Sequence, residues 1–195
     1  GVKTHTTINA VKSYYDSIVK YLIYGNVLKN NTYPLSVSAE RLSQAMHIAE
    51  HAKKMNAVAV AHGSTGAGND QVRFDMIFNI MIPGIEIITP IRDLQLSREA
   101  EIEYLKAKGV QMNFEKAAYS INKGLCAICA GGKETLHSKG LLPESAWPTQ
   151  VTKTGEEEIK IHFEKGAITW VNNQHFTHPS HAIQYIQSLA APYGI

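Results

Sequence analysis

The sequence predicts an α/β protein, in which part of a doubly wound parallel sheet is followed by part of an α+β domain. Three features of its 195 residues lead to this prediction. A wholly apolar run over residues 57–61 is followed by a glycine-rich loop and a helical pattern. A second short strand pattern, EIIT at residues 86–89, follows that helix. Beyond residue 109 the helical periodicity fades, and an alternating hairpin pattern replaces it.

Two helices are predicted ahead of the first apolar run. Apolar residues recur at three- and four-residue spacing over residues 9–29, which indicates the first helix. Pro34 prevents a helix from continuing, so the second begins near Ser36 or Ser38 and ends near Asn56. The apolar run that follows is typical of a strand buried on both faces of a parallel sheet.

Two more helices and a second strand complete this α/β part. Residues 70–81 are predicted to be helical, with Pro83 and Gly84 closing the helix. Residues 86–89 form the second buried strand, which Pro90 ends. A further helix is expected over residues 97–109, where the glutamates come early and the lysines late, as the helix dipole favours.

The remainder of the chain has a different texture. Residues 113–155 show little periodicity, with scattered glycines, prolines and small polar residues. Residues 159–163 and 167–171 alternate around a short turn, which predicts an antiparallel hairpin. Residues 179–189 form an amphipathic helix with Pro179 in its first turn. We therefore expect two domains, residues 1–112 and 113–195.

Composition excludes several classes of protein. Hydrophobic residues make up 44% and charged residues 18%, which is typical of a globular chain and not of a disordered one. The 19 basic and 17 acidic residues nearly cancel, so we expect no nucleic-acid partner. No apolar run approaches the roughly 20 residues that cross a bilayer, and no signal peptide is apparent. With two cysteines, these features predict a cytoplasmic protein without membrane association.

The loop over residues 62–69, HGSTGAGN, carries the chemistry that the sequence predicts. In an open α/β sheet, ligands bind beyond the carboxyl ends of the strands, where this loop lies. Its glycines allow positive φ angles and close approach to a ligand, and the helix after it favours anions at its N-terminus. Thr65, Asn69 and Asp70 add polar groups, and Arg73 could fork a carboxylate. The alternative is that Asn69 or Asp70 only caps the helix and that the glycines form a turn.

The loop matches no standard nucleotide motif. Its glycines are spaced differently from the dinucleotide fingerprint, and no Gly-Lys-Ser/Thr follows as in a Walker loop. The residues by themselves therefore indicate a site for an anion or zwitterion, with a nucleotide as one option.

Residues 61–74, AHGSTGAGNDQVRF, resemble the HG-[AS]-TG-x-GNDQVRF segment of the argininosuccinate synthase family. Residues 33–41, YPLSVSAER, resemble its citrulline-binding segment, and residues 85–92, IEIITPIR, resemble the strand after the glycine loop. The resemblance covers effectively the whole chain but only the middle of the family sequence. Because the family's phosphate-holding PP-loop, SGGxDTS, does not occur here, we expect a fragment that is inactive by itself.

The resemblance implies a nucleotide-binding domain of the adenine nucleotide α hydrolase type that lacks its first strand and PP-loop, followed by part of a synthetase domain. It implies an ATP-dependent C–N ligase that joins citrulline to aspartate and releases AMP and pyrophosphate in arginine biosynthesis. ATP would be a substrate accompanied by Mg²⁺, with no protein-bound metal, prosthetic group or covalent nucleophile. Family members are generally tetramers, so a homo-oligomer is expected.

The resemblance also assigns binding residues by position. The residues that would hold citrulline are Tyr33, Ser38, Asn69, Arg73, Ser120 and Cys129. Those that would hold aspartate are Thr65, Asn69 and Asp70, and those that would contact ATP are His62 and Gly63. Arg41 is a weaker candidate for the citrulline site.

For several of these positions the alternative is a purely structural role. Tyr33 could be a packing aromatic, Ser38 a helix cap and His62 an ordinary packed histidine. Cys129 stands where the family has a serine, and a thiol is a much weaker donor than a hydroxyl. With Cys126 it forms a lone CxxC, which is half a zinc site or simply two reduced residues in a loop. Ala67 replaces a lysine that many members carry.

Two other functional classes stay open. One is a diverged module that binds an amino acid or nucleotide without catalysis, which the missing PP-loop and Cys129 favour. The other is a generic α/β interaction domain, which leaves the long loop match without an explanation.

Overall fold

The computed structural model describes residues 2–66, 68–111, 119–126 and 128–195. The chain forms two compact units, one made of Gly1–Ala10 with Ser38–Glu115 and the other of Val11–Val37 with Lys116–Ile195. This grouping by contacts differs from the linear division at residue 112, and the two-domain assignment stays a prediction. Across the described residues, none of the helices combines the length and apolar character that a membrane span needs.

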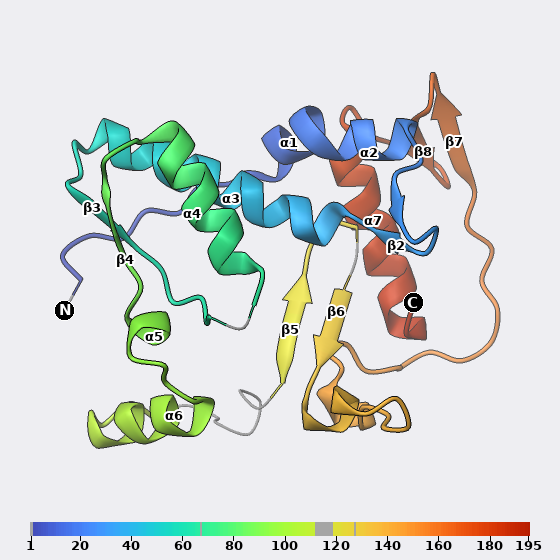
Figure 1. The fold of residues 1–195 in the computed structure, drawn as a ribbon. Coiled ribbons are helices and arrows are strands. Elements are labelled where there is room, and N and C mark those ends of the chain that lie inside the picture. The colour runs from blue at the N-terminus through green and yellow to red at the C-terminus, as the bar shows by residue number, and fades with distance from the viewer. Residues whose placement is uncertain (1, 67, 112–118, 127) are drawn as a thin grey trace. The chain divides into compact units, whose positions relative to one another are not determined.

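A strand–helix–strand motif forms the centre of the first unit (Figure 1). It consists of β3 (Ala59–Ala61), α4 (Asp70–Met81) and β4 (Glu86–Ile88). The strands pair in parallel, with Val60 opposite Ile87. The parallel pairing and the bounds of α4 confirm the sequence prediction. The two-domain α/β and α+β architecture as a whole stays a prediction, because the described part of this sheet is a single pair of strands.

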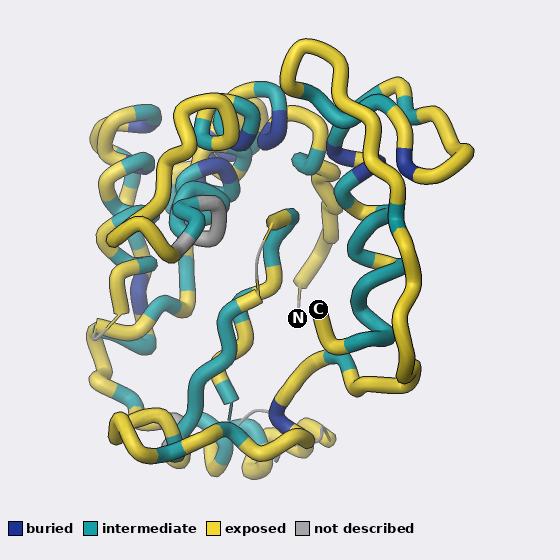
Figure 2. Tube along the Cα trace, turned by 90° about the vertical axis from the view of Figure 1, so that its right-hand side faces the viewer, coloured by how far each residue is buried: buried dark blue, intermediate teal, exposed yellow. Residues whose placement is uncertain are grey.

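The core of the first unit joins α3 (Ser36–Lys54) to this motif. Small residues on α3 allow close packing against β3 and α4, and the cluster comprises Ala45, Ala49, Ala52, Val60, Phe78 and Ile82. Phe78, on α4, is the largest side chain in it and is almost completely buried. Buried positions occur mainly inside helices and strands, whereas most loops are exposed (Figure 2).

The prediction that the first strand is buried on both faces is wrong. Val58 is 87% exposed, and the strand itself begins at Ala59. Within β3, Val60 is buried, Ala59 is half-buried and Ala61 is exposed, so the strand is not buried on both faces. A continuous apolar run therefore does not distinguish a strand covered on two faces from one covered on a single face.

Two helices follow β4 in the first unit. The short α5 (Pro90–Asp93) begins with Pro90 in its first turn, directly after the buried Thr89. The next helix, α6 (Arg98–Ala107), confirms the predicted one, and the Ser97 hydroxyl caps it by accepting from the Ala100 N–H.

The second unit contains the helix predicted over residues 9–29, but that helix is shorter. It runs as α1 (Val11–Tyr14), a π-helical segment η1 (Tyr15–Val19) and α2 (Lys20–Tyr24). The prediction is wrong beyond Tyr24, because β1 (Leu28–Lys29) pairs there with β2 (Tyr33–Pro34).

A hairpin between residues 113 and 155 was not predicted. It consists of β5 (Ser120–Lys123) and β6 (Ile128–Gly131), two short antiparallel strands followed by the 3₁₀ turns η3 (Lys133–Leu136) and η4 (Glu144–Ala146). Strands of this length carry too few residues for an alternating pattern to stand out.

The C-terminal elements follow the prediction more closely. The predicted hairpin is β7 (Ile161–Glu164) with β8 (Ala167–Val171), and β9 (Gln174–His175) adds a strand that was not predicted. Lys165 and Gly166 have φ angles of 50° and 81°, as a two-residue hairpin turn requires. The last helices are α7 (Pro179–Ala190) and the 3₁₀ turn η5 (Ala191–Tyr193).

Candidate active site

The glycine loop lies at the carboxyl end of β3 and leads directly into α4, as the sequence predicts. The expectation that its glycines use positive φ angles is wrong for Gly63, Gly66 and Gly68. A Cβ at Gly66 would lie 3.6 Å from Cγ of Arg92, and one at Gly63 would lie 3.9 Å from Cγ1 of Ile91. These are ordinary contact distances, so the main chain of the loop runs beside the β4–α5 connection, and the loop residues that the structure describes include none in the left-handed region.

The carboxylate of Asp70, in the first turn of α4, is the centre of one polar cluster. Its Oδ1 accepts from Nη1 of Arg73 at 2.8 Å, and its Oδ2 accepts from Nε of Arg41 at 3.3 Å. Nη2 of Arg73 also donates to the Ser38 hydroxyl at 3.2 Å. The cluster therefore brings together Ser38, Asp70 and Arg73, three residues that the resemblance assigned to substrates, with the weaker candidate Arg41.

This cluster has the charge pattern that recognises a zwitterion. The Asp70 side chain is 38% exposed, so an incoming ammonium group can reach its carboxylate. The two guanidinium groups beside it present planar sets of donors, which match a carboxylate geometrically. The ammonium and carboxylate groups of an amino acid could therefore bind the Asp70 carboxylate and the guanidinium groups, which pair with one another in the structure.

Asn69 and Thr65 are both exposed, and Asn69 directly precedes Asp70 in the chain. Asn69 occupies the N-cap position of α4, but its side chain forms no capping hydrogen bond, so the capping alternative is wrong for this residue. The Thr65 side chain is exposed in the loop. Both polar side chains are thus accessible from solvent.

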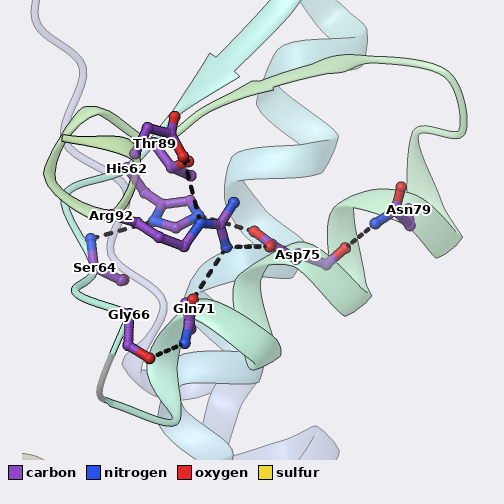
Figure 3. Close-up of polar contacts among 9 residues, drawn as sticks. His62, Ser64, Gly66, Gln71, Asp75, Asn79, Thr89 and Arg92 are labelled. Carbon is purple, nitrogen blue, oxygen red and sulfur yellow. Dashed lines mark hydrogen bonds and ion pairs between the residues drawn. The ribbon is translucent and has the colours of Figure 1, made fainter. Parts of the chain in front are cut away.

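His62 is packed into the first unit. Its side chain is 8% exposed and stacks on Phe74 at 5.4 Å between ring centroids. Nε2 lies 2.9 Å from Oδ1 of Asp75, and Nδ1 accepts from the Ser64 N–H at 3.2 Å (Figure 3). Since both ring nitrogens have partners within the protein, a nucleotide at this position would contact the backbone of His62 and the exposed Gly63.

Sequence reasoning missed a second polar cluster around the loop. Nη1 of Arg92, on α5, donates to Oδ2 of Asp75 at 2.6 Å and to Oε1 of Gln71 at 3.2 Å. Gln71 in turn donates to the carbonyl of Gly66. The signal was available, because Arg92 lies in the first helix after the carboxyl end of β4, the edge of the sheet where ligands bind.

The electrostatics of the second cluster follow from these bonds. Partial burial raises the pKa of Asp75, but hydrogen bonds from Arg92 and His62 more than offset this, so its pKa lies below the usual range. The hydrogen bond to Asp75 raises the pKa of Arg92 in turn.

The remaining predicted residues lie in the second unit. Ser120 and Cys129 are on paired strands, opposite Gly131 and Asn122 respectively, and the pleat places both on one face of the hairpin. Tyr33 lies in β2, with its side chain outside what is described. Cys126 is exposed and Cys129 is half-buried, and Ala67 lies outside the described residues. Among the side chains that are described, no group of three or more His, Cys, Asp or Glu residues is arranged to hold a metal ion.

Comparison with known proteins places this site in a family. A family model described as the "Arginosuccinate synthase N-terminal HUP domain", a nucleotide-binding α/β fold, matches residues 1–111. The argininosuccinate synthase of Sulfurisphaera tokodaii is 35% identical over 195 residues, which cover 100% of this chain and 50% of the relative.

Two other relatives agree with this assignment. The argininosuccinate synthase of Methanocaldococcus jannaschii is 36% identical, and the alignment covers 100% of this chain and 50% of the relative. That of Staphylococcus epidermidis is 32% identical, with 96% and 48% covered. The chain thus spans about half the length of the curated relatives it matches. Because the family model matches more than half of the chain and includes the loop described above, the chain belongs to the argininosuccinate synthase family.

Proposed function

We propose that the protein containing this chain joins citrulline to aspartate at the expense of ATP. The ureido oxygen of citrulline attacks the α-phosphorus of ATP, which forms a citrullyl-adenylate and releases pyrophosphate. The amine of aspartate then attacks the activated ureido carbon, loses a proton and displaces AMP, leaving argininosuccinate. The protein aligns the reactants for both steps and needs no covalent nucleophile.

The observation that supports this proposal best is the Asp70 cluster. A carboxylate flanked by Arg41 and Arg73 in the first turn of a helix can bind the ammonium of an amino acid while the guanidinium groups receive its carboxylates. The cluster lies at the carboxyl end of β3, where α/β proteins bind their ligands.

In this proposal Asp70 pairs with the ammonium of aspartate, with Thr65 and Asn69 as further donors and acceptors. Citrulline is proposed to bind Ser38, Asn69 and Arg73, and the family resemblance assigns Tyr33, Ser120 and Cys129 to the same substrate. Ser120 and Cys129 fall within residues 113–195, the proposed part of a synthetase domain. The shared face of Ser120 and Cys129 on the β5–β6 hairpin supports the assignment of these two to one ligand.

ATP is proposed to contact the backbone at His62 and Gly63. Mg²⁺, which neutralises phosphate charge when ATP is bound, would be held by phosphate oxygens, because the described carboxylates form no cage for it.

The proposal extends to assembly and location. Val72, Met76 and Ile80 form an exposed apolar stripe on α4. This stripe supports the proposal that α4 is buried at an interface, either in a homo-oligomer or against another part of the protein. A biosynthetic reaction that consumes ATP supports a cytoplasmic location, and so does the presence of only two cysteines in the chain.

A pyrophosphate-release assay on the complete protein tests the reaction. We expect release only when both citrulline and ATP are present, and we expect AMP to accumulate with argininosuccinate once aspartate is added. Calorimetry with citrulline and ATP on the same preparation separates the alternatives. Binding without pyrophosphate release would instead identify a non-catalytic module, and absence of binding would contradict both.

A further inference from the structure

We propose that Arg92 is a positioning residue that holds the glycine loop in its ligand-binding conformation through two chains of hydrogen bonds. The functional part of this inference rests on the proposed ligase activity. Arg92 lies on α5, after β4, and its guanidinium points toward α4 and the loop (Figure 3). Neither Arg92 nor its partners Gln71 and Asp75 belong to the substrate residues assigned above.

The first chain of hydrogen bonds ends on the carbonyl of Gly66. Nη1 of Arg92 donates to Oε1 of Gln71 at 3.2 Å, and Nε2 of Gln71 donates to the Gly66 carbonyl. An amide side chain that accepts from a fixed donor has its NH₂ group fixed as well, so Arg92 sets where Gln71 can hold the loop.

The second chain ends on the N–H of Ser64. Nη1 of Arg92 donates to Oδ2 of Asp75 at 2.6 Å, and Oδ1 of Asp75 lies 2.9 Å from Nε2 of His62. Because Nδ1 of His62 accepts from the Ser64 N–H, Nε2 carries the proton and donates to Asp75. Asp75 thus fixes both the tautomer and the orientation of the imidazole.

One guanidinium therefore controls both sides of the loop, at Ser64 and at Gly66. The backbone angles at Gly63 and Gly66 do not confine the loop to one conformation, because glycine has many alternatives of similar energy. The two chains of hydrogen bonds select one of them before a ligand arrives. The side chain of Arg92 is 30% exposed and that of Asp75 is 27% exposed, so the contact is partly shielded from water.

This arrangement predicts a specific kinetic consequence. If the loop is ordered only a fraction of the time, the apparent dissociation constant of a ligand rises by the inverse of that fraction. Aspartate and ATP are the ligands assigned to the loop, so their KM values should rise. Citrulline shares only Asn69 with the loop and is otherwise assigned to residues outside it, among them Ser38 and Arg73 on helices, so its KM should change less.

Amide hydrogen exchange at Ser64, measured by NMR on the complete protein, tests the structural half. We expect Arg92→Met to accelerate exchange of the Ser64 amide about tenfold, and Arg92→Lys, which keeps the charge beside Asp75, to restore most of the protection. Lys153→Met, which removes a 3.4 Å ion pair in the second unit, is the matched control and should leave Ser64 unchanged. Unchanged exchange in Arg92→Met would overturn the proposal whether or not the protein is a ligase.

Steady-state kinetics of the same variants test the functional half. We expect the KM for aspartate to rise about fivefold to tenfold in Arg92→Met, with kcat within about threefold and the KM for citrulline within about twofold. Gln71→Ala cuts only the Gly66 chain and should raise the KM for aspartate with Ser64 exchange nearly unchanged, which keeps the test available if Arg92→Met folds poorly. Faster exchange without a rise in the KM for aspartate would show that the loop needs no such support.

Discussion

The helix α4 carries two aspartates whose surroundings differ in kind. Asp70 pairs with Arg73 from its own helix and with Arg41 from α3, two residues that also donate to other side chains. Asp75 pairs with Arg92 and with His62, whose other nitrogen binds the backbone of the glycine loop. Breaking the first set exposes charges to a substrate, whereas breaking the second releases the loop itself. Residue type and position on a helix are thus insufficient to separate a binding carboxylate from a structural one.

The largest expected effect is on Asp70. Asp70→Ala removes the carboxylate that would pair with the aspartate ammonium, so kcat/KM for aspartate should fall about 100-fold, while citrulline-dependent pyrophosphate release stays within a few-fold of the unaltered protein. Separate assays of pyrophosphate and argininosuccinate measure the two steps. Equal loss of both would mean that Asp70 does not discriminate between the substrates.

Asp75→Ala should act mainly on stability. It leaves Arg92 and His62 without their shared partner, so the free energy of unfolding should fall by about 1 to 2 kcal/mol. Urea unfolding followed by circular dichroism measures this change, and Asp70→Ala serves as the comparison on the same helix. A larger loss of stability in Asp70→Ala than in Asp75→Ala would reverse the roles assigned to the two carboxylates.

The contribution of Asp75 to stability should also depend on pH, with a smaller effect than that of its removal. The pKa of Asp75 is depressed in the folded protein, so the stabilisation it provides is complete above its ordinary pKa of about 3.9 and disappears as pH falls through the lower folded value. In Asp75→Asn the melting temperature should therefore fall less steeply with decreasing pH over this range. Melting temperatures between pH 5 and pH 2.5, two values chosen to bracket the transition at about 3.9, give the measurement. If the melting temperature depended on pH in the same way in both proteins, Asp75 would not provide the stabilisation proposed here.

The smallest expected effect lies in the second unit. Cys129→Ser restores a stronger hydrogen-bond donor on the face of the β5–β6 hairpin that also carries Ser120. The KM for citrulline should fall about twofold to threefold, since the gain is at most one improved hydrogen bond. Cys126→Ser is a suitable control for loss of a thiol. A lower KM in the control alone would place the citrulline contact elsewhere.

How far the sequence predicts this fold depends on how local the signal is. The helix α4 and the β7–β8 hairpin were predicted because periodicity, Pro83 with Gly84, and the turn at Lys165 with Gly166 are encoded within a few residues. The β5–β6 hairpin and the π-helical segment were missed, since neither has a strong local pattern.

The candidate site shows the same limit. Local spacing placed Asp70 and Arg73 one turn apart, and their contact follows directly. The pairing of Arg41 with Asp70 across 29 residues, and of Asp75 with Arg92 across 17, depends on how α3, α4 and α5 pack. Helical spacing defines only which residues share a face of one helix, so these two pairings could be identified only from the three-dimensional structure.

The central claim is that Asp70 binds an amino-acid ammonium while Asp75 holds the loop. The most direct test is calorimetric titration of aspartate into the complete protein with citrulline present, comparing Asp70→Asn with Asp75→Asn. The account predicts that Asp70→Asn weakens aspartate binding about 30-fold or more and that Asp75→Asn weakens it by about fivefold at most. Equal weakening by both substitutions, or a stronger effect of Asp75→Asn, would contradict it.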